Sequence, residues 1–102
     1  MKPLFIPLKR EYYEAFVDGT KTVEYRKNGP RWNAQTCVVG RPVVISLGYG
    51  KQNRRVGVVT SFEVSNEPTK TDAWRDCYGD YEGDAACIGI ELEPLESKGN
   101  RK

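Results

Sequence analysis

The stretch that decides the fold of this chain is Gly-Thr-Lys-Thr-Val-Glu-Tyr-Arg, residues 19–26. Before it, residues 10–18 carry an apolar stripe at helical spacing, which predicts an amphipathic helix that ends at the glycine in a left-handed conformation. Residues 22–26 alternate and are rich in strand formers, which predicts a β-strand. Side chains two residues apart in a strand lie on one face, separated by roughly 6.7 Å. Glu24 and Arg26 can therefore meet, either as a pair or around a common ligand.

Four further strands and a second helix are predicted around this stretch. They are strands over residues 4–8, 42–47, 54–65 and 86–93, and a helix capped by Thr71 and closed by Gly79. The first of these is an edge strand or the end of a strand, because Pro3 and Pro7 lack backbone donors. The two central strands form a hairpin around a glycine-rich loop at residues 48–53. The connection over residues 31–40 has no assignable structure.

The side-chain pattern within each element indicates which residues share a face. In the first helix, the apolar face consists of Tyr13, Phe16 and Val17. In the strand over residues 54–65, one face consists of Val56, Val58, Thr60, Phe62 and Val64. Gly57 interrupts that strand and indicates a bend or a close backbone approach. In the last strand, one face consists of Ile88, Ile90 and Leu92.

Together these elements predict an α+β fold, a small β-barrel or strongly bent sheet of about five strands with two short helices. The 102 residues suit one domain, which we expect over residues 1–96, followed by a polar, disordered tail over residues 97–102. No apolar run is long enough to span a membrane, and the first residues do not form a signal peptide. We therefore expect a cytoplasmic protein, by default a monomer.

The residue types present restrict the chemistry that the chain can perform. It has no histidine and three cysteines, Cys37, Cys77 and Cys87, without a Cys-x-x-Cys pair. A zinc site would lack its usual ligands, so we expect no metal, no cofactor, and buried thiols that stay reduced. Histidine is the commonest general base, and without it any catalysis must use Lys, Glu, Asp, Tyr, Thr or Ser.

Charge is distributed unevenly along the chain, although the whole chain carries only +2. Residues 1–55 carry a net charge of +7 and residues 56–102 a net charge of −5. A basic face near residues 19–26 would attract a phosphate-bearing partner such as RNA or a nucleotide. The alternative is that the two halves interleave in space, so that the asymmetry averages out.

Residues 19–26 match the pattern G-x-K-x-x-E-x-R through Gly19, Lys21, Glu24 and Arg26. This pattern resembles the signature of the ASCH domain, within the PUA-like superfamily. The preceding helix, the central strand pair and residues 46–51 also resemble a small stand-alone ASCH subgroup common in bacteria and phages. The resemblance implies a PUA-like barrel with a cleft that the motif residues line, and a role in binding RNA or a nucleotide.

Enzymatic branches of the same family give a second hypothesis. One branch removes an acyl group from the exocyclic nitrogen of acetylated cytidine, and another member type has been assigned ribonuclease activity. In the amidohydrolase branch the motif lysine, here Lys21, is retained, but a threonine stands where this chain has Glu24. The lysine therefore carries over and the threonine does not. For a metal-independent hydrolase, the candidate catalytic residues are Lys21, as nucleophile, and Glu24, which could act as a base or hold a water.

The binding hypothesis assigns the floor of the cleft to Lys21, Glu24 and Arg26. Basic side chains that could contact phosphates, or equally be solvated surface charges, are Lys9, Arg31, Arg41, Lys51, Arg54 and Arg55. Trp32 and Tyr49 fall in predicted loops among basic residues, where each could stack on a base at roughly 1–3 kcal/mol or instead pack against the protein. A third hypothesis is a protein-interaction module in which the charged cluster is purely structural.

Overall fold

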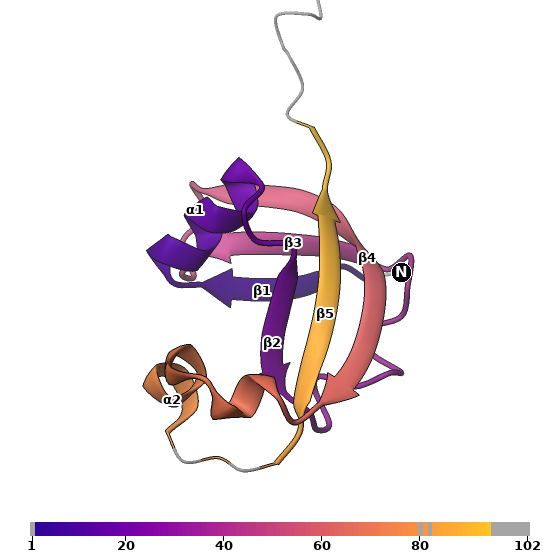
Figure 1. The fold of residues 1–102 in the computed structure, drawn as a ribbon. Helices are drawn as coiled ribbons and strands as arrows, with labels where there is room; N and C mark the ends of the chain where they lie inside the picture. Colours follow the sequence, from indigo (N-terminus) through magenta and orange to yellow (C-terminus); the bar gives the residue numbers. More distant parts are fainter. Residues whose placement is uncertain (1, 80, 82, 95–102) are drawn as a thin grey trace, which may run out of the picture.

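The structure is a computed structural model that describes residues 2–79, 81 and 83–94. Its strands are β1 (Leu4–Leu8), β2 (Val23–Lys27), β3 (Pro42–Leu47), β4 (Arg54–Ser65) and β5 (Ala85–Leu92). Its helices are α1 (Arg10–Asp18), α2 (Asp72–Tyr78) and a short 3₁₀ turn, η1 (Pro68–Lys70). In Figure 1 the sheet curls into a half-barrel, with α1 and α2 both on the left of the view. The predicted small, barrel-like α+β fold is confirmed.

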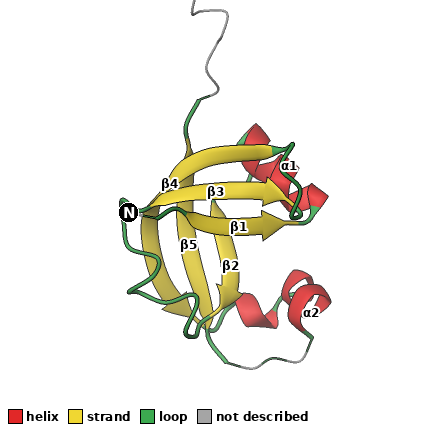
Figure 2. Ribbon diagram, turned by 180° about the vertical axis from the view of Figure 1, so that it is seen from behind, coloured by secondary structure: helices red, strands yellow, loops and turns green. Residues whose placement is uncertain are grey.

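The strand order is β1-β3-β4-β5-β2, in which β1 and β3 are parallel and the other neighbours are antiparallel. The two edges are therefore β1, as its prolines predict, and β2, which carries the motif. The start of β4 pairs with β3 and most of its remaining length pairs with β5, so β4 joins the two halves of the sheet (Figures 1 and 2). Because β4 bends between these partners, the sheet curls.

The side chains of β4 do not alternate over its whole length, as the sequence pattern had indicated. The pairing with β5 shifts register between Val59 and Ser61, which marks a β-bulge. Val59 is buried in the core, and Phe62 packs against that core after the bulge. Val56 and Val64, which the prediction placed on one apolar face with Phe62, are each 46% exposed. The prediction of a single face was wrong for Val56, because the extra residue reverses the alternation between Val56 and Phe62. Val64 lies on the same face as Phe62 but is exposed near the end of the strand.

The core lies inside the curl of the sheet. Its fully or almost fully buried members on the strands include Ile6, Val43, Ile45, Ile88 and Ile90. Helix α1 contributes Phe16, and it ends at Gly19, whose φ of 88° is the predicted left-handed cap. Val17 is 42% exposed, whereas Tyr12 and Tyr13 pack at the margin of the core. The helix is thus rotated about its axis relative to the face that its sequence indicates.

Helix α2 begins and ends where the sequence predicts. The hydroxyl oxygen of Thr71 accepts a hydrogen bond from the backbone N–H of Trp74 at 3.2 Å, which is an N-cap. Trp74 is buried with Ala85 and Cys87 in a second, smaller cluster at the start of β5. This cluster fixes α2 against the end of the sheet where β5 begins.

Several remaining predictions concern loops and termini. The connection over residues 31–40 consists of turns, and it buries Trp32 and Cys37. Cys87 is also buried, but Cys77 is exposed on α2, contrary to the expectation of three buried thiols.

Within the described part of the chain, no helix has the length and apolar character to cross a membrane. The tail predicted over residues 97–102 lies outside the described residues.

Candidate ligand-binding cleft

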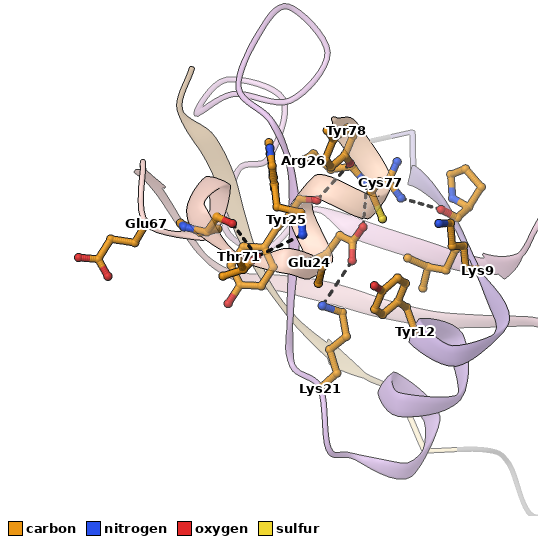
Figure 3. A pocket seen from close by; sticks show the side chains of 15 residues that line it. Lys9, Tyr12, Lys21, Glu24, Tyr25, Arg26, Glu67, Thr71, Cys77 and Tyr78 are labelled. Atoms are coloured by element: carbon orange, nitrogen blue, oxygen red, sulfur yellow. Dashed lines mark hydrogen bonds and ion pairs between the residues drawn. The ribbon is translucent and has the colours of Figure 1, made fainter. Parts of the chain in front are cut away.

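A cleft of about 640 Å³ opens between α1 and α2, beside the two edges of the sheet (Figure 3). One wall comes from the end of β1 and the start of α1, with Pro7, Leu8, Lys9 and Tyr12. The floor comes from the motif, with Lys21, Glu24, Tyr25 and Arg26. The other wall comes from η1, α2 and the residue before η1, with Glu67, Pro68, Thr71, Ala73, Trp74, Cys77 and Tyr78. The motif thus lies at the base of an open depression.

Glu24 is the centre of the charged cluster in this floor. Its side chain is only 10% exposed, and its two carboxylate oxygens face different cations. The Nζ atom of Lys21 lies 3.7 Å from Oε1, and the Nε atom of Arg26 donates to Oε2 at 2.8 Å. The prediction that Glu24 and Arg26 share one face of a strand and can meet is confirmed.

Arg26 ties the two edges of the sheet together. One of its terminal nitrogens donates to the backbone oxygen of Pro7 at 2.6 Å, and Pro7 lies on β1 while Arg26 lies on β2. Its guanidinium carbon also lies 4.9 Å from the centre of the Trp32 ring. Because Glu24, Pro7 and this ring hold the guanidinium and the side chain is only 16% exposed, Arg26 mainly positions the floor of the cleft.

Lys21 is held by aromatic rings as well as by Glu24. Its Nζ atom lies 5.0 Å from the ring centre of Tyr25 and 5.5 Å from those of Tyr12 and Phe16. An ammonium is attracted to the faces of such rings, and this attraction is stronger where water is partly excluded. The ammonium has three donors, so its contact with Glu24 leaves donor capacity for a ligand in the cleft.

The wall formed by α2 is the part of the site that sequence reasoning missed. Trp74 and Tyr78 fit the buried stripe of a short helix, and this pattern alone gives no sign that the same helix faces the motif. The hydroxyl of Tyr78 donates to the backbone oxygen of Tyr25 at 3.3 Å and so links α2 to β2. Trp74 is buried, as the stripe predicts, and it also contributes to the cleft lining.

Two tyrosines of the cleft are held in their neutral form. Burial raises the pKa of Tyr78; Arg26 nearby lowers it and Glu24 raises it, with burial the largest effect. Burial also raises the pKa of Tyr12, and the thiol of Cys77 on the opposite wall adds to that rise. Both phenols therefore stay protonated near neutral pH, where each O–H can donate a hydrogen bond.

The structure separates the other candidate residues into those at the cleft and those elsewhere. Lys9 lies at its rim and is exposed. Trp32 is buried in the core beneath Arg26, and Arg31 is exposed beside it with its guanidinium carbon 5.2 Å from the ring centre. Tyr49 and Lys51 are exposed in the β3–β4 loop, and neither contributes to the lining.

Three further arginines named as phosphate contacts bind the protein backbone. Arg41 donates to the oxygens of Lys2 and Thr36, which fixes the connection before β3. Arg54 donates to the oxygen of Gly50, and Arg55 donates to that of Glu93. The cleft itself combines Lys9, Lys21 and Arg26 from the basic half of the sequence with Glu67 and α2 from the acidic half. The two halves therefore interleave at this site.

No cluster of metal-binding side chains occurs in the part of the chain that the structure describes. No protein-family model matches the chain, and a search of curated proteins finds no significant match. What the cleft binds must therefore be inferred from its own side chains.

Proposed function

We propose that this protein is an ASCH-type module that binds RNA or a nucleotide, and that a base enters the cleft over Lys21, Glu24 and Arg26. The observation that carries this proposal is a charged cluster at the base of an open, mainly apolar depression whose lining includes the rings of Tyr12, Tyr25, Trp74 and Tyr78. The resemblance of residues 19–26 to the ASCH signature is a second support. The barrel-like fold is also what that resemblance implies.

The shape and chemistry of the cleft suit a flat, polar-edged ligand. A volume of about 640 Å³ lies within the range of small-molecule sites. A base has two π faces and an edge of donors and acceptors, so aromatic walls and a charged floor can engage it together. The carboxylate of Glu24 would accept from an amino group, and the ammonium of Lys21 would donate to a carbonyl or ring nitrogen.

Phosphate recognition is expected to be modest at this site. Lys9 at the rim is the exposed cation of the cleft lining, whereas the side chain of Arg26 is only 16% exposed and is bound to Glu24 and Pro7. Each phosphate contact made by a single strand adds about 0.7 to the slope of log affinity against log salt. Binding in the cleft alone should therefore have a shallow salt dependence, with most of the affinity coming from the base.

The change Lys21→Ala tests this proposal in a titration with nucleoside monophosphates and short single-stranded RNA. Hydrogen bonds to charged groups contribute about 1.5–3 kcal/mol. Among the nucleotides that the unaltered protein binds, we therefore expect the variant to bind each roughly 10- to 100-fold more weakly. Lys70→Ala is the matched control, because Lys70 is an exposed lysine that does not line the cleft. Absence of binding at millimolar nucleotide, or an equal response to both variants, would contradict the proposal.

The second candidate is a small amidohydrolase acting on an N-acylated nucleoside. The observation that favours it is that Lys21 and Glu24, the candidate catalytic residues, lie 3.7 Å apart at the base of one cleft. The titration above separates the two functions if N-acetylated cytidine is included among the ligands. Release of acetate that Lys21→Ala abolishes would favour the enzyme. Binding without turnover would favour the module.

A further inference from the structure

A second surface with aromatic and cationic side chains lies outside the cleft, at the loop between β3 and β4. Tyr49 is 79% exposed, and its ring centre lies 6.1 Å from that of Phe5 on β1. The guanidinium carbon of Arg54 lies 5.0 Å from the centre of the Phe5 ring. The three side chains thus form one cluster, which we call the hairpin cluster.

The hairpin cluster is held in place by the backbone of its own loop. Arg54 donates from Nε to the oxygen of Gly50 at 3.0 Å and from a terminal nitrogen to the oxygen of Tyr49 at 3.4 Å. The hydroxyl of Ser46, which is buried, also donates to the oxygen of Gly50 at 3.2 Å. These bonds close the loop, so the Tyr49 ring is presented from a constrained backbone.

This cluster adjoins the rim of the cleft. The backbone N–H of Gly48, just before Tyr49, donates to the oxygen of Leu8 at 2.9 Å, and Leu8 lines the cleft. Phe5 and Pro7 are two residues apart on β1 and therefore lie on the same face of that strand. Pro7 also lines the cleft, so the face of β1 that carries Phe5 continues into the cleft wall.

The charge of the hairpin loop is uncompensated within the described structure. Lys51 and Arg54 are exposed, and neither takes part in any of the ion pairs found among the described residues. A ligand that reaches this loop from the cleft would meet two cations and an exposed ring. Alternating phosphates and bases satisfy both kinds of group, because phosphates pair with cations and bases stack on rings and guanidinium planes.

We propose that the hairpin cluster is a stacking subsite for single-stranded nucleic acid that extends from the cleft across β1. This inference rests on the proposed function of the cleft, and it adds that the ligand is a strand and not only a free nucleotide. An acidic peptide would satisfy the cations but would leave Tyr49 without a stacking partner. Tyr49 and Arg54 do not line the cleft, so a mononucleotide bound over Lys21 is not expected to depend on them.

The experiment compares a nucleoside monophosphate with single-stranded RNA of about eight nucleotides, a length typical of such sites. Tyr49→Ala is expected to weaken binding of the RNA roughly tenfold and to leave binding of the monophosphate unchanged. Tyr49→Phe keeps a ring and should bind the RNA as the unaltered protein does. Arg54→Ala should lower the salt slope for the RNA by about 0.7. Arg75→Ala, which removes an exposed arginine on α2, is the charge-matched control.

The outcomes distinguish this inference from the function proposed for the cleft. If Tyr49→Ala binds RNA as tightly as the unaltered protein while Lys21→Ala does not, the hairpin subsite is refuted and the cleft stands. If the RNA responds to Tyr49→Ala but the monophosphate does not bind and Lys21→Ala has no effect, the cleft proposal fails and the hairpin surface stands. If a polyglutamate peptide competes as well as RNA, or if RNA does not bind, the hairpin proposal is overturned.

Discussion

Replacing Glu24 with glutamine is expected to lower the free energy of unfolding by about 3 kcal/mol. The amide keeps the size of the side chain but removes its charge, which leaves Lys21 and Arg26 as unpaired cations. Their side chains are only 18% and 16% exposed, so water cannot fully replace the lost carboxylate. For a domain of this size, a loss of 3 kcal/mol lowers the melting temperature by on the order of 12 °C or more. Thermal and urea unfolding followed by circular dichroism measure this loss.

The matched control for this change is Glu14→Gln on α1. Glu14 also forms an ion pair, with Arg10 at 3.5 Å, but both side chains are more than 60% exposed. An exposed helical pair of this kind contributes about 0.3–0.5 kcal/mol. Equal, small losses of unfolding free energy in the two variants would show that Glu24 does not stabilise the fold through a largely buried charged cluster.

Gly57→Ala is expected to destabilise the fold by about 3 kcal/mol through a clash within the sheet. A Cβ atom at this position would lie 2.5 Å from the backbone oxygen of Glu91 and 3.0 Å from the Cα atom of Leu92. Both neighbours are backbone atoms of β5, so relief requires one strand to move away from the other. Gly57 pairs with both β3 and β5, at the place where β4 passes between them. Thermal and urea unfolding followed by circular dichroism measure this loss of stability as well.

Gly50→Ala is the control for the glycine change. A Cβ atom there would meet no heavy atom within 4 Å, and the residue does not have a positive φ. Alanine at such a position restricts the unfolded chain and is expected to be neutral or to stabilise the fold by up to about 1 kcal/mol. If Gly57→Ala were equally well tolerated, the close approach of β4 and β5 would not be the reason for this glycine.

The features that the sequence predicted well are those that depend on neighbouring residues. The left-handed end of α1 at Gly19, the cap of α2 at Thr71 and the shared face of Glu24 and Arg26 all follow from local backbone geometry. The edge position of β1 follows from its prolines, which lack donors for a ladder. The close approach at Gly57 also follows from an interruption that the strand pattern itself contains.

The features that the sequence did not predict depend on contacts between distant segments. The bulge in β4 lies within its pairing with β5, between Val59 and Ser61, just beyond the end of its pairing with β3 at Val58, and no local pattern reveals it. The place of α2 opposite the motif follows from the strand order, which puts β2 beside β5. Trp32 was a candidate for stacking, yet the closure of the two sheet edges buries it under Arg26. In each case the local sequence determines the strand, helix or side chain involved. The packing of the whole sheet determines where it lies and what it contacts.

The measurement that tests the proposed function most directly is an amide chemical-shift titration of isotope-labelled protein with nucleoside monophosphates. We predict that the largest changes fall on both sides of the cleft, at Lys21, Glu24 and Tyr25 on the motif and at Thr71 and Cys77 on α2. These residues are far apart in the sequence but share one depression in the structure. Changes confined to residues that do not line the cleft, or none at millimolar nucleotide, would contradict the account.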